Sequence, residues 1–167
     1  MPTPDSDLFL SQSQLIDQNF NNLVLSFSTV EDKYLDSTSI NYATFEDVTF
    51  KKCHFDICLM EQCQFTNCRF EGVRMTHSLA AGSTFQDCLF TDCDLISINF
   101  NGIDALYTRW EASDLYYSRF ISSRLNGAKF HDCNLKRVDF SHSLRTDVSF
   151  KSSNVQDAYL GRKGDEQ

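Results

Sequence analysis

The sequence predicts an all-β solenoid of square cross-section, and three observations carry the prediction. From Ile40 to Leu160, nearly every residue whose number ends in 0 or 5 is large and apolar. The residue two positions earlier is usually small or β-branched, as at Ala43, Val48 and Cys53. Residues twenty apart share a side-chain type, one series being aromatic and another mostly aliphatic. The two series are Phe50, Phe70, Phe90, Trp110, Phe130 and Phe150, and Phe55, Met75, Leu95, Leu115, Leu135 and Val155.

Two inward residues separated by one outward residue have the geometry of a β-strand, since alternate side chains share a face. The pattern restarts every five residues, so the chain turns a corner after each short strand and winds into a solenoid. Like residues at i and i+20 stack on one wall if four pentapeptides make one coil. We therefore expect parallel strands on four walls and about six to seven coils.

Several units resemble the repeat of the pentapeptide-repeat family, which reads approximately Ala-Asp/Asn-Leu-X-X. The resemblance covers about three quarters of the chain. It implies a right-handed quadrilateral parallel β-helix, and it leaves the function open because fold does not fix function. The matching units include Ala43-Thr-Phe45, Cys93-Asp-Leu95, Ser113-Asp-Leu115, Ala128-Lys-Phe130, Cys133-Asn-Leu135 and Val138-Asp-Phe140.

Residues 40–160 are the predicted repeat domain, and the segments on either side are expected to differ from it. Residues 1–13 contain Pro2 and Pro4 and are expected to form a flexible leader. Residues 14–39 keep large residues at the fives, but Gln18 and Lys33 suit the small inward position poorly. This segment is predicted to be an irregular first coil or a cap, with an amphipathic cap helix as the competing interpretation. Residues 161–167 form a polar tail, and either this tail or a second copy, in a homodimer, is expected to cover the last coil.

Three repeat positions carry a residue that breaks the rule of large and apolar. A guanidinium in a dry interior costs several kcal/mol, so Arg145 is expected to point outward while Leu144 swings inward through a local bulge. The same exchange is expected at the two alanines. The three positions are Ala80, Ala105 and Arg145, and their apolar neighbours are Leu79, Leu106 and Leu144.

All seven cysteines fall on the small inward position, which predicts buried, reduced thiols. A spacing of five places successive cysteines on different walls, unlike the close pairs of zinc sites. Cys68 and Cys88 should stack at about 4.8 Å, but parallel side-chain directions disfavour a disulfide. We expect no metal and no cofactor. The seven are Cys53, Cys58, Cys63, Cys68, Cys88, Cys93 and Cys133.

The motifs of the common enzyme classes are missing from the sequence. It contains no glycine-rich phosphate loop and no nucleophile elbow, and its four histidines fall on outward positions of different coils. The formal net charge is −8, but residues 40–160 hold 15 acidic and 12 basic residues, a mixed surface without a basic stripe. Direct binding to nucleic acid is therefore not expected. No apolar run is long enough to span a membrane and no secretory signal is recognisable, so a cytoplasmic protein is expected, with secretion as an effector left open.

Two groups of outward residues are candidate partner-binding sites. Five carboxylates should gather at one corner, where Asp94 stacks on Asp114. Four apolar side chains on two adjoining walls should form a contact surface, with Ile96 one coil from Tyr116. The acidic group is Asp92, Asp94, Glu111, Asp114 and Asp132, and the apolar group is Ile96, Tyr116, Tyr117 and Ile121.

The predicted function is that of a non-enzymatic protein-binding module. The resemblance implies its most specific version, because some pentapeptide-repeat proteins imitate DNA and modulate or protect a type II topoisomerase such as gyrase. Against that version, the chain lacks the apolar C-terminal helix through which those proteins dimerise, and its coils are nearly balanced in charge. The alternative is a bacterial effector or scaffold that docks a different protein through the exposed aromatic residues.

Overall fold

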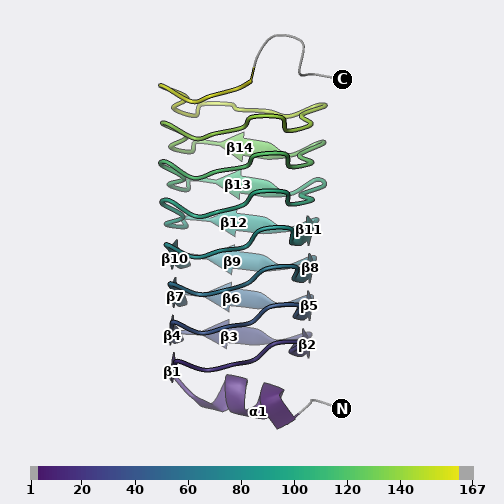
Figure 1. Ribbon diagram of the computed structural model, residues 1–167, viewed down its shortest axis with the longest axis vertical. Helices are drawn as coiled ribbons and strands as arrows, with labels where there is room; N and C mark the ends of the chain where they lie inside the picture. The colour runs from purple at the N-terminus through teal and green to yellow at the C-terminus, as the bar shows by residue number, and fades with distance from the viewer. Residues whose placement is uncertain (1–3, 162–167) are drawn as a thin grey trace.

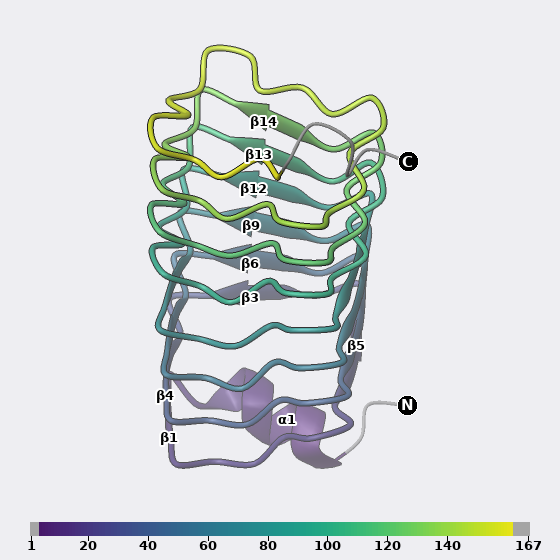
Figure 2. The same ribbon diagram turned by 45° about the horizontal axis from the view of Figure 1, so that its top comes forward.

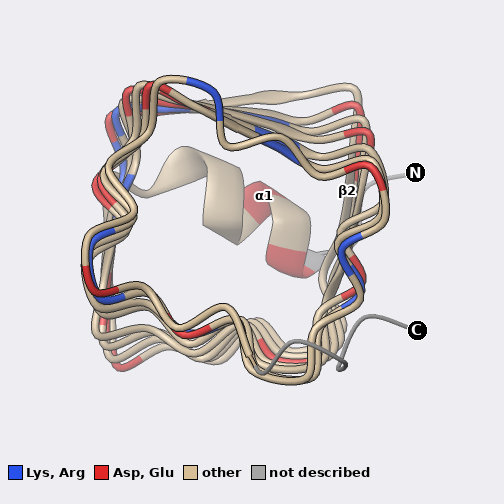
Figure 3. Ribbon diagram, turned by 90° about the horizontal axis from the view of Figure 1, so that it is seen from above, with Lys and Arg blue, Asp and Glu red and all other residues tan. Residues whose placement is uncertain are grey.

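The computed structural model describes residues 4–161, which form a right-handed rod of stacked square coils preceded by one helix (Figure 1, Figure 2). Partner residues on neighbouring coils differ by twenty, as in the pairing of Phe50 with Phe70 and of Phe70 with Phe90. Four pentapeptides therefore make one coil, as predicted. Seen along the rod, the coils superpose as a square (Figure 3).

Three walls of the square contain parallel sheets of three-residue strands, and the remaining wall is held by single bridges. We number the walls in chain order. The first wall contains β1 (Gln14–Ile16), β4 (Tyr34–Asp36), β7 (His54–Asp56) and β10 (Arg74–Thr76). The second wall consists of the single bridges that run from Asn19 to Tyr159. The third wall contains β2 (Val24–Ser26), β5 (Thr44–Glu46), β8 (Gln64–Thr66) and β11 (Thr84–Gln86), and the fourth contains β3 (Thr29–Glu31), β6 (Thr49–Lys51), β9 (Arg69–Glu71), β12 (Leu89–Thr91), β13 (Arg109–Glu111) and β14 (Lys129–His131).

The interior of the rod is filled by the large residues at the fives, whose rings stack from coil to coil. On the fourth wall the ring centroids of Phe70 and Phe90 lie 4.3 Å apart, and those of Trp110 and Phe130 lie 4.6 Å apart. Rings on adjoining walls meet edge to face, as Trp110 and Phe120 do at 5.6 Å. Stacked and edge-to-face rings are the two favourable geometries for aromatic pairs, so each ring is held along the rod and across it.

The small inward position serves the backbone as well as the packing. Its side chain donates a hydrogen bond to a carbonyl of the preceding coil, from Cys63 Sγ to Ile40 O at 3.0 Å and from Ser83 Oγ to Met60 O at 2.7 Å. The Ser83 hydroxyl also accepts a bond from the Cys63 amide at 3.0 Å. Cysteine, serine and threonine share this ability, which explains why they alternate at the position. All seven thiols are free and buried, so the prediction for the cysteines is confirmed.

The corners of the square require an unusual backbone at every fifth residue. From Asp17 to Asp157, each residue whose number ends in 2 or 7 has a positive φ, between 48° and 69°. Glycine, asparagine and aspartate adopt this region most easily. A large side chain there costs about 1–2 kcal/mol, yet Phe27, Ile57 and Tyr117 all occupy corners.

The N-terminal end of the rod is closed by α1 (Pro4–Ser11), so the expected flexible leader is instead a helix over most of its length. Phe9 of this helix is fully buried and meets Phe20 edge to face at 5.3 Å. Residues 14–39 follow as β1 to β4, paired in register with the next coil. The end cap is therefore the preceding helix rather than these residues. A single apolar anchor in eight residues gives no helical periodicity, which is why the sequence pattern did not predict α1.

Lys33 joins this cap to the rod. It occupies a small inward position, is only 4% exposed, and donates hydrogen bonds to the carbonyls of Leu10, at 3.2 Å, and of Gln12. Its ammonium also lies 5.7 Å from the centroid of the Phe9 ring. Burial lowers the pKa of Lys33 from its ordinary value. A cation beside the last carbonyls of a helix satisfies groups that the helix itself leaves unpaired.

Replacing Lys33 with methionine should release α1 while keeping most of the buried side-chain volume. Hydrogen bonds to a charged group contribute about 1.5–3 kcal/mol, so the free energy of unfolding should fall by that amount. Urea denaturation measures the loss, and protease cleavage within residues 4–13 should appear at the same time. Lys52→Met, at an exposed corner, is the matched control and should change neither. A Lys33→Met protein of unchanged stability would contradict the assigned role.

The expected bulges at the three rule-breaking positions do not occur. Ala80 and Ala105 point inward and are 1% and 0% exposed, so the repeat keeps its register there. Leu144 stays outside, 38% exposed, and Arg145 takes the inward direction, with its guanidinium donating to the carbonyl of Leu160. The prediction for Arg145 was wrong because the last coil lies at the open end of the rod, where a charged group keeps contact with solvent. The predicted polar tail lies outside the described residues, apart from Gly161.

Candidate functional site

Three of the four predicted apolar residues lie together on the outside of the rod. The rings of Tyr116 and Tyr117 are 6.2 Å apart, and Ile96 lies one coil earlier in the same column as Tyr116. Ile121 lies on the far side of the second wall, where its amide donates to Asn101 Oδ1 at 3.1 Å. The structure therefore brings together Ile96, Tyr116 and Tyr117, which we call the aromatic patch, and leaves Ile121 outside it.

Tyr117 is the most exposed member of the aromatic patch, and its ring contributes little to the packing of the rod. It occupies a corner with a φ of 59° and is 59% exposed. Tyr107 shares this backbone conformation, but its ring packs over Gly127, where an added Cβ would meet it at 2.5 Å. At the same corner one coil after Tyr117 stands Arg137, not a glycine. A strained, exposed ring that contributes little packing is a candidate for a contact with another molecule.

The five predicted carboxylates divide into structural and exposed members. Asp94 forms an ion pair with Arg74 at 3.4 Å, and Glu111 pairs with Arg109 at 3.6 Å. Asp114 Oδ1 accepts hydrogen bonds from the amide of Tyr116, at 2.9 Å, and from Asn134 Nδ2, at 3.0 Å.

The amide two residues on also donates to the side-chain oxygen of Asp139 and of Asn134. This local hydrogen bond explains the aspartate or asparagine of the repeat unit, because it satisfies a backbone amide at the turn. The remaining two carboxylates, Asp92 and Asp132, are exposed at the corner between the fourth and first walls. Within residues 4–161 neither forms an ion pair, and Asp114, which is held by its two hydrogen bonds, forms none either.

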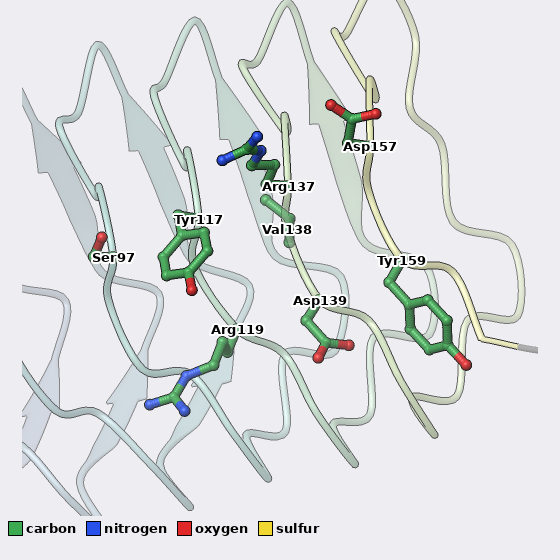
Figure 4. A pocket seen from close by; sticks show the side chains of 8 residues that line it. All are labelled: Ser97, Tyr117, Arg119, Arg137, Val138, Asp139, Asp157 and Tyr159. Atoms are coloured by element: carbon green, nitrogen blue, oxygen red, sulfur yellow. The ribbon is translucent and has the colours of Figure 1, made fainter.

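A shallow groove of about 500 Å³ lies beside the aromatic patch, at the corner between the first and second walls (Figure 4). Tyr117 lies towards its earlier coils and Tyr159 at its last coil, and charged side chains lie between them. The sequence pattern did not predict this groove, because its residues are far apart in the chain. Writing the sequence in rows of twenty would have aligned most of them in two columns that are two positions apart. The charged members are Arg119, Arg137, Asp139 and Asp157.

The described residues offer few groups for chemistry. Among residues 4–161, no three histidine, cysteine or carboxylate side chains are placed to hold a metal ion. Burial raises the pKa of Cys58, Cys63 and Cys133 to about 11 and that of Cys93 to about 12, which holds these thiols in the protonated, unreactive form. No helix in the described part of the chain combines the length and the apolar character of a membrane span.

Comparison with known families matches this architecture. A model described as the pentapeptide repeat region matches residues 83–160, and one described as pentapeptide repeats in eight copies matches residues 58–95. Together they cover the greater part of the rod. The chain belongs to the pentapeptide-repeat family. No curated protein sequence matches it.

Solved structures of similar fold have low sequence identity to the chain. QnrB1, described as a plasmid-mediated fluoroquinolone resistance protein, is 15% identical over 90% of both chains, with a TM-score of 0.39. Rfr23, a pentapeptide repeat protein from the cyanobacterium Cyanothece 51142, is 10% identical over 96% of this chain and 97% of its own, with a TM-score of 0.34. HetL from Nostoc sp. strain PCC 7120, involved in heterocyst differentiation regulation, is 9% identical over 96% and 95%, with a TM-score of 0.28.

Proposed function

We propose that the protein is a non-enzymatic module that binds another protein through the aromatic patch and the adjoining acidic corner. The observation that carries the proposal is the placement of Tyr117, which keeps a strained backbone and a mostly exposed ring. Tyrosine is enriched at protein interfaces because its ring is rigid and its hydroxyl can form hydrogen bonds. A partner with apolar side chains flanked by basic ones would complement the patch and the exposed Asp92 and Asp132.

Replacing both Tyr116 and Tyr117 with serine should abolish capture of the partner without lowering stability. Interface aromatics often contribute 2 kcal/mol or more to binding, which is about a thirtyfold loss in affinity. Stability should not fall, because the two rings pack against each other outside the core and serine adopts corner positions elsewhere in the rod. Capture of the partner is measured by affinity purification from the native host's lysate. Mass spectrometry then compares the proteins captured by the wild type and by the variant.

Tyr42→Ser is the matched control for this variant. Tyr42 is also a corner residue, with a φ of 61° and 61% exposure, but it lies on a different corner of the square. The control should retain every captured protein. If the double variant also retains them, the aromatic patch is excluded as the binding surface.

The most specific version of the proposal is a DNA-mimicking modulator or protector of a type II topoisomerase such as gyrase. Membership of the family supports it, together with a rod lined at one corner by Asp92 and Asp132. The ion pairs of Asp94 and Glu111 weaken it, since they reduce the net negative charge of that corner. A gyrase supercoiling assay with increasing amounts of this protein tests this version. No effect at micromolar protein would reject it in favour of a different protein partner.

We also propose the predicted homodimer through the C-terminal coil. Val155 and Leu160 of this coil are 41% and 40% exposed, and a second copy would bury them. Light scattering after size exclusion measures the mass in solution. A Val155→Lys variant should shift a dimer to a monomer, and a wild-type protein that is monomeric at high concentration would reject the dimer.

A further inference from the structure

A second groove, of about 460 Å³, lies at the N-terminal end of the rod, between α1 and the first strand of the third wall. We call it the end groove. Asp7 and Leu10 line it from α1, and Val24 lines it from β2. Seen along the rod, α1 crosses the end of the square with its first turn on the side of β2 (Figure 3). Leu10 and Val24 are both exposed, so the helix that caps the rod leaves the edge of the third wall partly uncovered.

β2 is an edge strand of the third wall, and part of its backbone points towards the end groove. The sheet order β11-β8-β5-β2 gives β2 a single neighbour. The amide of Thr44 in β5 donates to the carbonyl of Leu23 at 2.8 Å. Alternate residues of a parallel strand bond to opposite sides, so the amides of Val24 and Ser26 and the carbonyl of Val24 point away from β5. An edge of this kind accepts a further strand.

Phe27 adds a large apolar side chain beside the end groove. It lies between Ser26 and Ser28, which line the groove, and occupies the corner that follows β2 with a φ of 50°. Its ring is 78% exposed, the highest value among the large apolar residues that the structure describes. A single exposed apolar residue is ordinary, but Leu10, Val24 and Phe27 lie around one groove, which is typical of a contact surface.

The surroundings of the end groove are acidic. From β2 to β11, the strands of the third wall and the corners that follow them carry three carboxylates and no lysine or arginine. The first turn of α1 adds two more carboxylates. Within residues 4–161, none of the five forms an ion pair. A basic occupant would therefore be attracted to this end of the rod. The five are Asp5, Asp7, Glu46, Asp47 and Asp87.

We propose that the end groove binds an extended, basic segment of a partner protein, which adds to β2 as a further strand. Side chains of a strand alternate between its two faces. Apolar side chains at every second position would enter the groove against Leu10. The lysines or arginines between them would face outward, within reach of Glu46 and Asp7, and their aliphatic stems would cover Phe27. The end groove is separate from the aromatic patch, so this proposal does not rest on the proposed function.

The peptide KVKFKVK with blocked ends is the probe, because it alternates apolar and basic residues. It is titrated into the full-length protein, and the amide signals are followed by NMR. The signals of Val24 and Ser26 should shift, and the acidic peptide EVEFEVE should not shift them. The probe methylated on its three central backbone amides cannot donate hydrogen bonds from them to β2 and should bind at least tenfold more weakly.

Phe27→Ser should weaken binding of the probe by about tenfold, the loss typical of an aromatic contact residue. Ile57→Ser is the matched control and should bind as the wild type does, because Ile57 is an exposed corner residue with a φ of 53° on another corner. Serine occupies other corners of the rod, so both variants should fold.

Reversing the charge of the third wall should reverse the preference between the two peptides. Glu46→Lys with Asp47→Lys should weaken binding of KVKFKVK and admit EVEFEVE. The rod tolerates lysine there, since Lys51 and Lys52 occupy the equivalent positions of the fourth wall.

Three results would overturn the proposal directly: no shift at Val24, equal binding of the methylated probe, or unchanged binding by Phe27→Ser. A wild-type protein that dimerises, and that Phe27→Ser returns to a monomer, would assign the end groove to a second copy and overturn it as well. The variant with serine at Tyr116 and Tyr117 should bind the probe as the wild type does. Loss of binding in that variant would place the probe on the aromatic patch and contradict the proposal.

Discussion

Raising the pH from 8 to 10 should remove roughly 5 kcal/mol from the free energy of unfolding, because four buried thiols then lose a proton only in the unfolded chain. Burial raises the pKa of Cys58, Cys63 and Cys133 to about 11 and that of Cys93 to about 12, from an ordinary value of 9.0. Above pH 9 the unfolded state binds fewer protons than the folded state, so stability falls as the pH rises.

The stabilisation by these thiols is fully present below pH 9 and is lost progressively as the pH rises through 11 to 12. For each thiol, the free energy of unfolding falls by about 1.4 kcal/mol for every pH unit between its unfolded and its folded pKa. Small domains are stable by about 5–15 kcal/mol, so four thiols can bring the protein close to unfolding at pH 10. The lowered pKa values of Lys33 and Cys68 act in the opposite sense, whereas the raised pKa values of Cys53 and Cys88 add to the loss of stability.

Urea denaturation at pH 8, 9 and 10 measures this dependence of stability on pH. The absorbance of the thiolate, followed through the unfolding transition, assigns the dependence to the cysteines. The control replaces Cys58, Cys63, Cys93 and Cys133 with serine. Serine fits these positions, because serine occupies the same position one coil later in each of the four columns. These serines are Ser78, Ser83, Ser113 and Ser153. The control should show a flatter pH dependence, and an equally steep one would show that the thiols are not its cause.

Phe90→Ala should destabilise the protein by about 3–5 kcal/mol, the range for removing a buried ring. Phe90 is fully buried between the rings of Phe70, at 4.3 Å, and Trp110, at 5.4 Å. Neighbouring coils are tied together by their backbone bonds and cannot close the cavity. A loss in the middle of the rod should therefore be felt in full.

Phe150→Ala is the matched control, because Phe150 belongs to the same column but is only partly buried at the last coil. It should cost clearly less, and thermal or urea unfolding of both variants measures the difference. Equal losses for the two variants would show that burial along the column does not set the stability.

The repeat could be predicted from sequence because burial alone decides it. A large side chain every fifth residue specifies the inward direction of the whole chain, and Ala80 and Ala105 follow it although they fill little space. Arg145 follows it as well, which the local cost of burying a guanidinium did not foretell. Its surroundings are set by its place at the end of the rod, and a pattern within five residues carries no such information.

The outer surface was harder to predict, because its groups come from separate coils. The stacking of Asp94 on Asp114 follows from the period of twenty, and the bridge between them has this register. Their structural hydrogen bonds and ion pairs depend on side-chain geometry, which the pattern does not give. The same holds for Lys33, whose partners are carbonyls of a helix that the periodicity did not indicate.

The most direct test of the account is the reaction of the seven thiols with Ellman's reagent at pH 8. The account places every thiol inside the rod, so none of the seven should react in the native protein and all seven should react after unfolding in urea. Rapid reaction of several thiols in the native protein would contradict the inward position of the cysteines, and with it the square coil on which every other conclusion depends.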